Sequence, residues 1–497
     1  MTARTLVLED TAALNAPQPL PALRPTELAQ PVAPAPSPND SAAQGPPPAP
    51  SLEPGATFHG LKVHSVLGEG GMGAAHLVSH PVLRMPLVLK TFKTGAPAQI
   101  FREAHLAARV SSPQVVSVLD AGVEDGVAFV VQRYVDGLDL EELLHAMRAV
   151  GRRLPVDMVI RVLLDAARGL QAIHQAGVVH RDVKPANLFL CGSGATMVGD
   201  FGIATEALRR EESEPLLGTP SFMAPEQWHQ GTVDRRTDLY ALGATAHLLA
   251  TNDTPFHGAS AAQLGVAHVT QSYAPPAPRD PREAYLFAVI ERLLRKRPEE
   301  RYDAAEAVAR ALEVLAEPGA RLVSHGDDRA HVGDLRIELC VGDIAATEAD
   351  VIVNAANWKL VMDMGVAAAL KRAGGAALEE DAQRHAPSAM GQVVWTAAGA
   401  LRARYVAHAI AARDGAICLQ RATLRTLLGA DARRCASVAF PALGTGVGEV
   451  PMALGAKLIL ETIRTFAWLR PEHVRTLRVV LFNDDAFALW REVLRSM

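Results

Sequence analysis

The chain has 497 residues, of which 49% are hydrophobic and 21% are charged, and its formal net charge is −5. This length predicts two or three domains, and the composition is typical of soluble globular proteins rather than disordered or membrane proteins. The negative net charge offers no cationic surface, so we expect no nucleic-acid partner. No apolar run approaches the roughly 20 residues that span a bilayer, and no secretory signal opens the chain, so we expect a cytoplasmic protein with no membrane partner.

The four cysteines are scattered and lack the spacing of metal or redox motifs. We expect them to be small buried residues in a reducing compartment, with a disulfide or zinc role as the less favoured alternative. They are Cys191, Cys340, Cys418 and Cys435.

Residues 1–56 predict a disordered tail, because this segment is rich in proline and alanine and has few large apolar side chains. Such a segment cannot offset its ordering entropy by burial. A solubilising spacer is the favoured interpretation, and a docking site for a proline-binding partner is the alternative.

Order is expected from residue 57, where a strand over 61–67 leads into a glycine-rich loop that spans Gly68, Gly70 and Gly73. Glycines at these spacings let backbone amides approach phosphates. The pattern alone could equally be a flexible hairpin. Because strand character resumes over 75–78, where a dinucleotide-binding loop would open a helix, the kinase type of loop is favoured.

A further strand, 87–90, ends in Lys90, and the helix that follows carries Glu103. A lysine at a strand end is usually a surface charge, and a helical glutamate is often simply exposed. Their order after the glycine loop instead predicts that Lys90 holds the α- and β-phosphates and pairs with Glu103.

The segment 127–131 is a predicted buried strand that leads to a hinge at 132–137. Asp139 follows, where a carboxylate could meet a ribose hydroxyl. A helix is predicted over 157–174, and Gly177 ends it.

The stretch 180–187 reads His-Arg-Asp-Val-Lys-Pro-Ala-Asn. Asp182 can accept a proton from an attacking hydroxyl, Lys184 can neutralise charge on the moving phosphoryl group, and Asn187 can hold a magnesium ion. With Asp200 a short loop downstream, this pattern predicts the catalytic loop and metal ligands of a phosphotransferase.

Together these motifs resemble, in order, the signature set of the protein kinase superfamily, and the branch is similar to bacterial, eukaryotic-like Ser/Thr kinases. The remaining motifs are Asp200-Phe201-Gly202, Gly218-Thr219-Pro220 and Ala224-Pro225-Glu226. The resemblance implies that Asp200 chelates magnesium, Phe201 packs under the Glu103 helix and Thr219 abuts the catalytic loop. It also implies that Asp238 braces the catalytic loop, Glu226 pairs with Arg301, Val135 offers its amide to adenine, and Ala75, Val88 and Phe189 contact the nucleotide.

Two features depart from or refine this pattern. Valine and alanine are exchanged at Ala75 and Val88 relative to the family, and we expect the adenine ceiling to be preserved by compensation. Arg181 suggests an activation loop controlled by phosphorylation. That loop, 203–217, is acidic and carries only Thr205 and Ser213 as hydroxyls, so its glutamates could partly replace a phosphate.

Beyond a linker predicted at 317–332, strands alternate with helices, which predicts a three-layer α/β domain over 333–497. Polar residues follow its strands, where such sheets bind ligands. The strings Gly342-Asp343-Ile344, Val353-Asn354-Ala355-Ala356-Asn357 and Phe440 to Val447 resemble the macro domain family. Macro domains bind ADP-ribose and its relatives, and some hydrolyse its protein esters.

The resemblance implies that Asp343 reads the adenine amino group, Asn357 contacts the distal ribose, and Phe482 contacts adenine, unless Phe482 is an ordinary buried residue. The other implied ligand residues are Ile344, Gly365, Val366, Gly444, Thr445, Gly446 and Val447.

Asp363 and Glu449 replace glycines of the family, and at about 5 Å from a diphosphate each carboxylate would cost about 3 kcal/mol. We therefore expect weakened or altered ligand choice. Ala367 stands where hydrolytic members carry an acid, which favours binding over hydrolysis.

The resulting prediction is an α+β bilobal protein kinase fold over 57–316, joined to the α/β macro domain. Its expected function is ATP- and Mg²⁺-dependent phosphorylation of Ser/Thr on protein substrates, with the macro domain binding ADP-ribose or ADP-ribosylated protein. The alternatives are a pseudokinase scaffold with an ADP-ribose reader, and an ADP-ribosyl hydrolase with a regulatory kinase domain.

Overall fold

The computed structural model describes residues 52–70, 73–93, 97–201, 220–229, 231–316, 321–326, 328–413, 416–446 and 448–497. Most of the predicted N-terminal tail, the activation loop 203–217, Gly202, Gly218, Thr219 and Val447 lie outside these residues.

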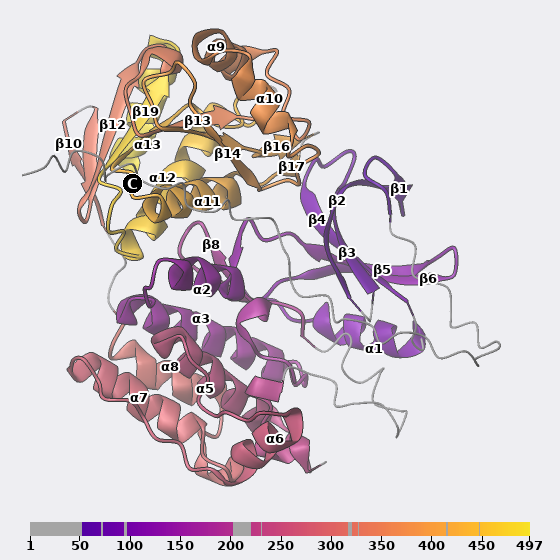
Figure 1. Cartoon of the computed structure of the whole chain (residues 1–497). Helices are drawn as coiled ribbons and strands as arrows, with labels where there is room; N and C mark the ends of the chain where they lie inside the picture. The colour runs from indigo at the N-terminus through magenta and orange to yellow at the C-terminus, as the bar shows by residue number, and fades with distance from the viewer. Residues whose placement is uncertain are drawn as a thin grey trace, which may run out of the picture. The chain divides into compact units, whose positions relative to one another are not determined.

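The first lobe is a six-stranded antiparallel sheet with one helix, α1 (Pro97–Ala107), packed against it (Figure 1). The strand order is β1-β2-β3-β4-β6-β5. Its strands are β1 (Thr57–Phe58), β2 (Leu61–Gly70), β3 (Gly73–Ser79), β4 (Pro86–Phe92), β5 (Val118–Glu124) and β6 (Val127–Arg133). The predicted strands on both sides of the glycine loop are therefore present, and they pair with each other.

Strand β4 shows why this sheet has two different faces. Leu87 and Leu89 are buried in the core of the lobe, whereas Val88 and Lys90 alternate with them and are half-buried. Because successive side chains of a strand point to opposite faces, Lys90 is directed away from that core.

The second lobe is mainly helical and carries a small sheet in the order β7-β8-β9. Its strands are β7 (Gly137–Asp139), β8 (Leu188–Cys191) and β9 (Thr196–Val198). Its helices are α2 (Leu140–Ala149), α3 (Val156–Gln175), α4 (Pro225–Trp228), α5 (Arg235–Thr251), α6 (Ala261–Thr270), α7 (Pro281–Leu293) and α8 (Ala305–Glu313), with short 3₁₀ turns η1 (Pro185–Asn187), η2 (Pro220–Phe222) and η3 (Pro298–Glu300).

Helices α3 and α5 form the centre of this lobe. The predicted stop of α3 is confirmed, since the helix ends before Gly177, which has a φ of 78°. Helix α5 is capped at its N-terminus by Asp234, whose side chain accepts a hydrogen bond from the amide of Arg236, and at its C-terminus by Asn252, which is in the left-handed region. Within the residues described, no helix is long and apolar enough to cross a membrane.

The C-terminal domain contains an eight-stranded sheet in the order β10-β11-β12-β19-β18-β13-β15-β14. Its strands are β10 (Leu322–His325), β11 (Arg329–Val332), β12 (Leu335–Val341), β13 (Val351–Ala355), β14 (Val393–Ala397), β15 (Tyr405–Ala409), β18 (Ser437–Phe440) and β19 (Thr476–Leu481), and a separate hairpin joins β16 (Ala412–Arg413) to β17 (Ala416–Ile417). The central strands β12, β19, β18, β13 and β15 are parallel.

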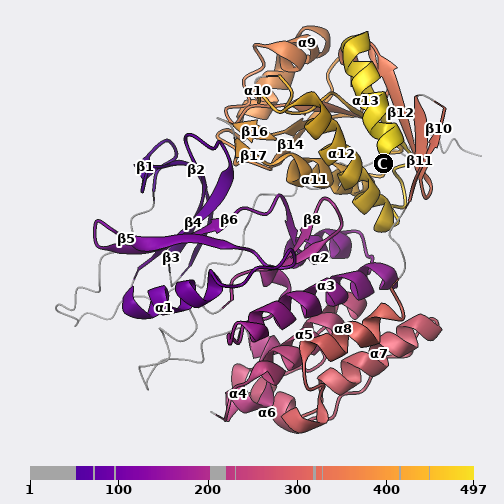
Figure 2. The same ribbon diagram turned by 180° about the vertical axis from the view of Figure 1, so that it is seen from behind.

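Helices cover both faces of this sheet, as the sequence predicts. Ile352 and Val480 pack with α9 (Gly365–Gly374) and α10 (Ala377–Gln383), whereas their neighbours Val353 and Val479 pack with the helices of the other face. Those helices are α11 (Leu419–Ala432), α12 (Met452–Trp468) and α13 (Asp484–Ser496) (Figure 2). The result is three layers, with a short 3₁₀ turn, η4 (Ile344–Ala346), after β12.

The sheet begins earlier than expected. Strands β10 and β11 lie within the segment 317–332, which the sequence predicts as a linker; β10 pairs with β11, and β11 pairs with β12. Ala330 and Val332 are buried, so the strands belong to this domain. Their glycine- and aspartate-containing turn has the composition of a linker, which explains the difference.

Candidate active site and candidate ligand site

The catalytic loop ends in the turn η1, which brings three of the predicted site residues together. Lys184 Nζ lies 2.8 Å from Asp182 Oδ2. Asn187 Nδ2 donates to the carbonyl oxygen of Asp182 at 2.7 Å and to its Oδ2 at 3.0 Å. The Asp182 carboxylate is thus held between an ammonium and an amide, which fixes its direction.

The backbone of this loop is held by Asp238 of helix α5, which is fully buried. Its two carboxylate oxygens accept hydrogen bonds from the amides of His180 at 2.8 Å and Arg181 at 2.7 Å. His174 Nε2 lies 2.7 Å from the same carboxylate. The expectation that Asp238 braces the catalytic loop is therefore confirmed, and the positive φ of Arg181, 68°, shows how tightly the chain turns there.

Lys90 from the first lobe forms an ion pair with Asp200 from the second. Burial disfavours ionisation of Asp200, but the charge of Lys90 and its hydrogen bond outweigh this, so the pKa of Asp200 lies below its usual value. The predicted partner of Lys90 was Glu103, whose side chain lies outside the described part of the structure. That pairing stays a prediction.

The atoms near Asp200 fit a magnesium ion. Asn187 uses its Nδ2 for both hydrogen bonds to Asp182, so its Oδ1 is the atom that could bind a cation. Asp200 uses Oδ1 for Lys90, which leaves Oδ2 for the same purpose. Carboxylate and amide oxygens are the ligands that Mg²⁺ prefers, usually with water and phosphate oxygens completing the shell.

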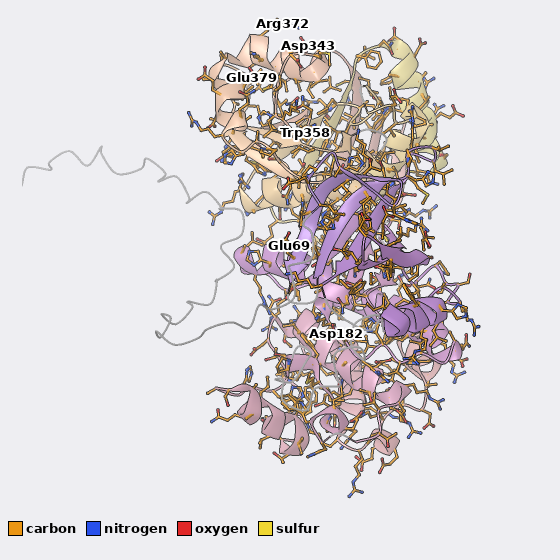
Figure 3. The ribbon with its side chains drawn as sticks, turned by 90° about the vertical axis from the view of Figure 1, so that its right-hand side faces the viewer. Glu69, Asp182, Asp343, Trp358, Arg372 and Glu379 are labelled. Atoms are coloured by element: carbon orange, nitrogen blue, oxygen red, sulfur yellow. The ribbon has the colours of Figure 1, made fainter. Side chains whose placement is uncertain are left out.

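The strands of the first lobe place the residues predicted to surround a nucleotide. Ala75 lies opposite Lys90 in the register of β3 and β4, and Val88 lies two residues from Lys90 on the same face. Gly68 and Gly70 end β2. A Cβ on Gly73 would lie 1.8 Å from the carbonyl oxygen of Thr91, so only glycine fits there. In Figure 3, Glu69 of the glycine loop and Asp182 of the catalytic loop come from the two lobes.

The hinge connects these lobes. Val135 is buried in a cluster with Val116 and Met197, and Phe189 packs against that cluster. Asp139 has a role that the sequence did not indicate, since its Oδ1 caps helix α2 by accepting a hydrogen bond from the amide of Glu142 at 2.8 Å. A ribose contact by Asp139 stays a prediction.

A second long-range expectation is confirmed at the base of the helical lobe. Arg301 donates to Glu226 through Nη1 at 2.7 Å and through Nη2 at 2.8 Å. The Arg301 side chain is fully buried. This bidentate pair ties the segment after the activation loop to the end of the domain.

The predicted ligand residues of the C-terminal domain lie at one edge of its sheet. Strands β12, β19, β18 and β13 are parallel neighbours, so their carboxyl ends meet at the same edge. Asp343 follows β12, Phe482 follows β19, Gly444 follows β18 and Asn357 follows β13. The sheet therefore aligns residues that are far apart in sequence.

Asp343 and Phe482 are exposed at two adjacent strand ends. Leu481 pairs with Val341, and the amide of Gly342 donates to the carbonyl oxygen of Leu481 at 2.9 Å. Phe482 is 70% exposed, so the alternative of a buried strand-end residue is wrong. Figure 3 labels Asp343 at the same end of the domain as Arg372 of helix α9.

Asn357 organises the loop that follows β13. Its Oδ1 accepts hydrogen bonds from the amides of Lys359 and Val361, and its Nδ2 donates to the carbonyl oxygen of Val361 at 2.8 Å. The first asparagine of the motif, Asn354, is buried, and its Nδ2 lies 3.0 Å from Nδ1 of His408. Its Oδ1 has no hydrogen-bond partner among the described residues, a property that spacing in the sequence could not reveal.

The glycines of this edge adopt conformations that favour glycine. Gly365 begins helix α9 with a φ of 54°, and Gly444 has a φ of 77°. Thr445 donates from Oγ1 to the carbonyl oxygen of Ala442 at 2.8 Å. Gly446 directly follows Thr445 in the loop after β18. On the side of the sheet covered by α9, Ile344 is buried in the core and Val366 packs against it.

The two carboxylates that were expected to oppose a diphosphate have different surroundings. Glu449 forms an exposed ion pair with Arg84 of the β3–β4 turn. Asp363 is exposed. Ala367 is buried in the core beneath α9 and carries no acid.

The fold and these two sites define a protein kinase domain followed by a macro domain. A family model described as the protein kinase domain matches residues 61–312, about half of the chain, so the chain belongs to that family. A second model, described as the Macro domain, matches residues 353–459.

Several curated relatives come from mycobacteria. The chain is 35% identical over 291 residues to serine/threonine-protein kinase PknF of Mycobacterium tuberculosis (strain ATCC 25618 / H37Rv), which covers 56% of this chain and 59% of that protein. It is 34% identical over 255 residues to PknB of the same strain and 32% identical over 254 residues to PknB of Mycobacterium leprae (strain TN), and each match covers 48% of this chain and 40% of the relative. The chain thus spans less than two thirds of the length of these relatives.

Proposed function

We propose that the chain is an ATP- and Mg²⁺-dependent serine/threonine protein kinase whose macro domain binds ADP-ribose or a related nucleotide. The observation that carries the kinase part is the held carboxylate of Asp182 together with the Lys90–Asp200 pair across the two lobes. The similarity to two mycobacterial serine/threonine-protein kinases supports serine and threonine as the residues that receive the phosphoryl group.

In this proposal Asp182 accepts the proton of a serine or threonine hydroxyl while that oxygen attacks the γ-phosphorus of ATP. The new oxygen–phosphorus bond forms as the bond to the β-phosphate oxygen breaks, and ADP leaves. Lys184 neutralises charge on the transferred group, and Lys90 holds the α- and β-phosphates. Magnesium, held by Asn187 and Asp200, would neutralise phosphate charge.

Phosphorylation with labelled ATP tests the kinase against the pseudokinase scaffold. The Asp182→Asn variant should lose about 10²- to 10⁴-fold in rate, the usual contribution of a positioned general base. Phosphoamino-acid analysis should give phosphoserine or phosphothreonine. A wild-type chain that binds ATP without incorporating label, or a variant as active as wild type, would support the scaffold.

For the macro domain, the supporting observation is the alignment of Asp343, Phe482, Gly444 and Asn357 along one sheet edge. The pairing of Glu449 with Arg84 offsets one of the charges that would repel a diphosphate. Binding is favoured over ester hydrolysis because Ala367 supplies no acid.

Calorimetry with ADP-ribose and the full chain tests this ligand. Asp343→Ala should weaken binding by about threefold to tenfold, the effect of losing one hydrogen bond. Asp334→Ala is a matched control, because Asp334 precedes β12 at the opposite edge of the sheet. Equal affinities for the two variants, or no heat with wild type, would contradict the proposal.

The proposal also includes protein substrates, a cytoplasmic location, a kinase domain over 57–316, and recognition of ADP-ribosylated protein by the macro domain.

A further inference from the structure

The hinge of the kinase domain contacts the first turn of a helix in the macro domain. The described residues from 52 to 497 belong to one compact unit. Within it, the carboxylate of Asp136 accepts hydrogen bonds from the amides of Gln420 and Arg421, both at 2.8 Å. These amides belong to the start of α11, where helices have unpaired amides and a partial positive charge. Asp136 is therefore an N-terminal cap supplied by the other domain.

A charged cluster extends this contact to helix α2. Glu142 lies in the first turn of α2 and accepts from Arg421 Nη2 at 2.8 Å and from Arg425 Nε at 2.5 Å. The two arginine side chains are each 17% exposed, and Glu142 is 28% exposed. Burial raises the pKa of Glu142, but the two arginines outweigh it, so the net pKa lies below its usual value. Charge-assisted hydrogen bonds between side chains that are mostly shielded from water are stronger than ion pairs on the exposed surface.

Apolar residues of both domains form one cluster beside these charges. Leu77 and Tyr134 come from the first lobe and the hinge. Val88, which is predicted to cover adenine, packs against this cluster. The macro domain contributes Leu360, Met390, Ile410 and Cys418, all of which are buried. Tyr134 is 7% exposed, so the side chain just before Val135 is covered largely by this cluster.

The contact continues along the helical lobe. Thr465 of α12 donates to the carbonyl oxygen of Gly192 at 2.6 Å. A Cβ on Gly192 would lie 2.6 Å from Gln420 and from Thr462, so the β8–β9 turn fits closely against α11 and α12. Arg152, which precedes α3, donates to the carbonyl oxygen of Leu469 at 2.8 Å.

We propose that the macro domain docks on the kinase hinge and on helix α2, and that this docking positions the hinge for nucleotide binding. The contact is made by Asp136 and Glu142 of the kinase domain with Arg421 and Arg425 of the macro domain. Arg421 and Arg425 are then positioning residues for ATP, although they lie more than 280 positions from the hinge in sequence. The inference rests on the proposed kinase function but goes beyond it, because it makes the macro domain part of the architecture of the nucleotide site.

The test uses the full chain with both arginines reversed, Arg421→Glu/Arg425→Glu. We expect amide hydrogen exchange over 134–137 to become at least about tenfold faster and ATP affinity, measured with a fluorescent ATP analogue, to fall about threefold to tenfold, because both ion pairs with Glu142 are replaced by repulsion between like charges. Adding Glu142→Arg restores opposite charges and should recover most of both losses. Arg336→Glu/Arg402→Glu makes the same change in net charge at two exposed positions outside these contacts and should leave both values unchanged.

The milder Glu142→Gln variant, made on the kinase side, covers the case in which the double reversal unfolds the macro domain, and it should shift both values in the same direction by a smaller factor. Unchanged hinge exchange and ATP affinity in folded Glu142→Gln and in the double variant would overturn the inference. Absence of ATP binding in the wild-type chain would instead refute the kinase proposal, so the two failures are distinguishable.

Discussion

Replacing Asp238 with asparagine should slow catalysis without preventing ATP binding. The carboxylate of Asp238 accepts from the amides of His180 and Arg181 and lies 2.7 Å from Nε2 of His174. An asparagine side chain keeps one oxygen that can accept a hydrogen bond. Its amide nitrogen is a donor, and it would face groups that also donate, namely a backbone amide of the loop or Nε2 of His174. His174 can adjust by exchanging tautomers, but one buried backbone amide of the loop loses its partner.

The magnitude follows from the hydrogen bonds lost. An unsatisfied buried amide costs about 1 to 3 kcal/mol, and the remaining bond loses its charge assistance, about 1 kcal/mol more. The loop must still reach the same geometry in the transition state, so this cost of about 2 to 4 kcal/mol should appear as a fall in kcat of about 30- to 1000-fold.

The assay is steady-state phosphorylation of a peptide at varied ATP concentration, with melting temperature measured in parallel. Asp165→Asn is the matched control, because Asp165 is a fully buried aspartate of the same lobe that accepts from the amide of Thr196 at 3.0 Å, away from the catalytic loop. We expect the control to lose stability and keep its kcat. An Asp238→Asn enzyme that retains kcat within about threefold while remaining folded would refute the reasoning.

Three further outcomes are expected. Arg301→Met should lower the free energy of unfolding by about 3 to 5 kcal/mol, measured by urea titration, because it leaves Glu226 buried without its partner; a loss below about 1 kcal/mol would contradict this. Burial lowers the pKa of His408 to about 4. The unfolded state therefore binds the extra proton first as pH falls from 6.5, and up to about 3 kcal/mol of stability should be lost by pH 4. Unfolding at several pH values should show a flatter dependence for His408→Gln, and identical slopes would disprove the assignment. Val88→Ala should weaken ATP binding in titrations, and Ala75→Val in the same chain should restore it; unchanged affinity in the single variant would contradict the compensation.

The catalytic loop is the part of the site that sequence reasoning reached best. Asp182, Lys184 and Asn187 lie within six positions, so a short turn places them together almost regardless of the rest of the chain. The pairing of Glu226 with Arg301 spans 75 positions, and it was predicted only because the whole set of motifs resembles a known family. The side-chain surroundings of Asp139 and Glu449 differed from expectation, since neither a helix cap nor a partner on another element is written in local spacing.

The sequence by itself determined the two domains, their fold classes and the loop that carries the proposed chemistry, because periodicity and short motifs encode local geometry. Only the tertiary structure decided that Lys90 faces Asp200, that β10 and β11 join the second sheet, and that Asp136 caps α11. These contacts form between surfaces that pack closely and exclude water. Which surfaces meet depends on the packing of the whole folded chain, so no single segment of the sequence predicts it.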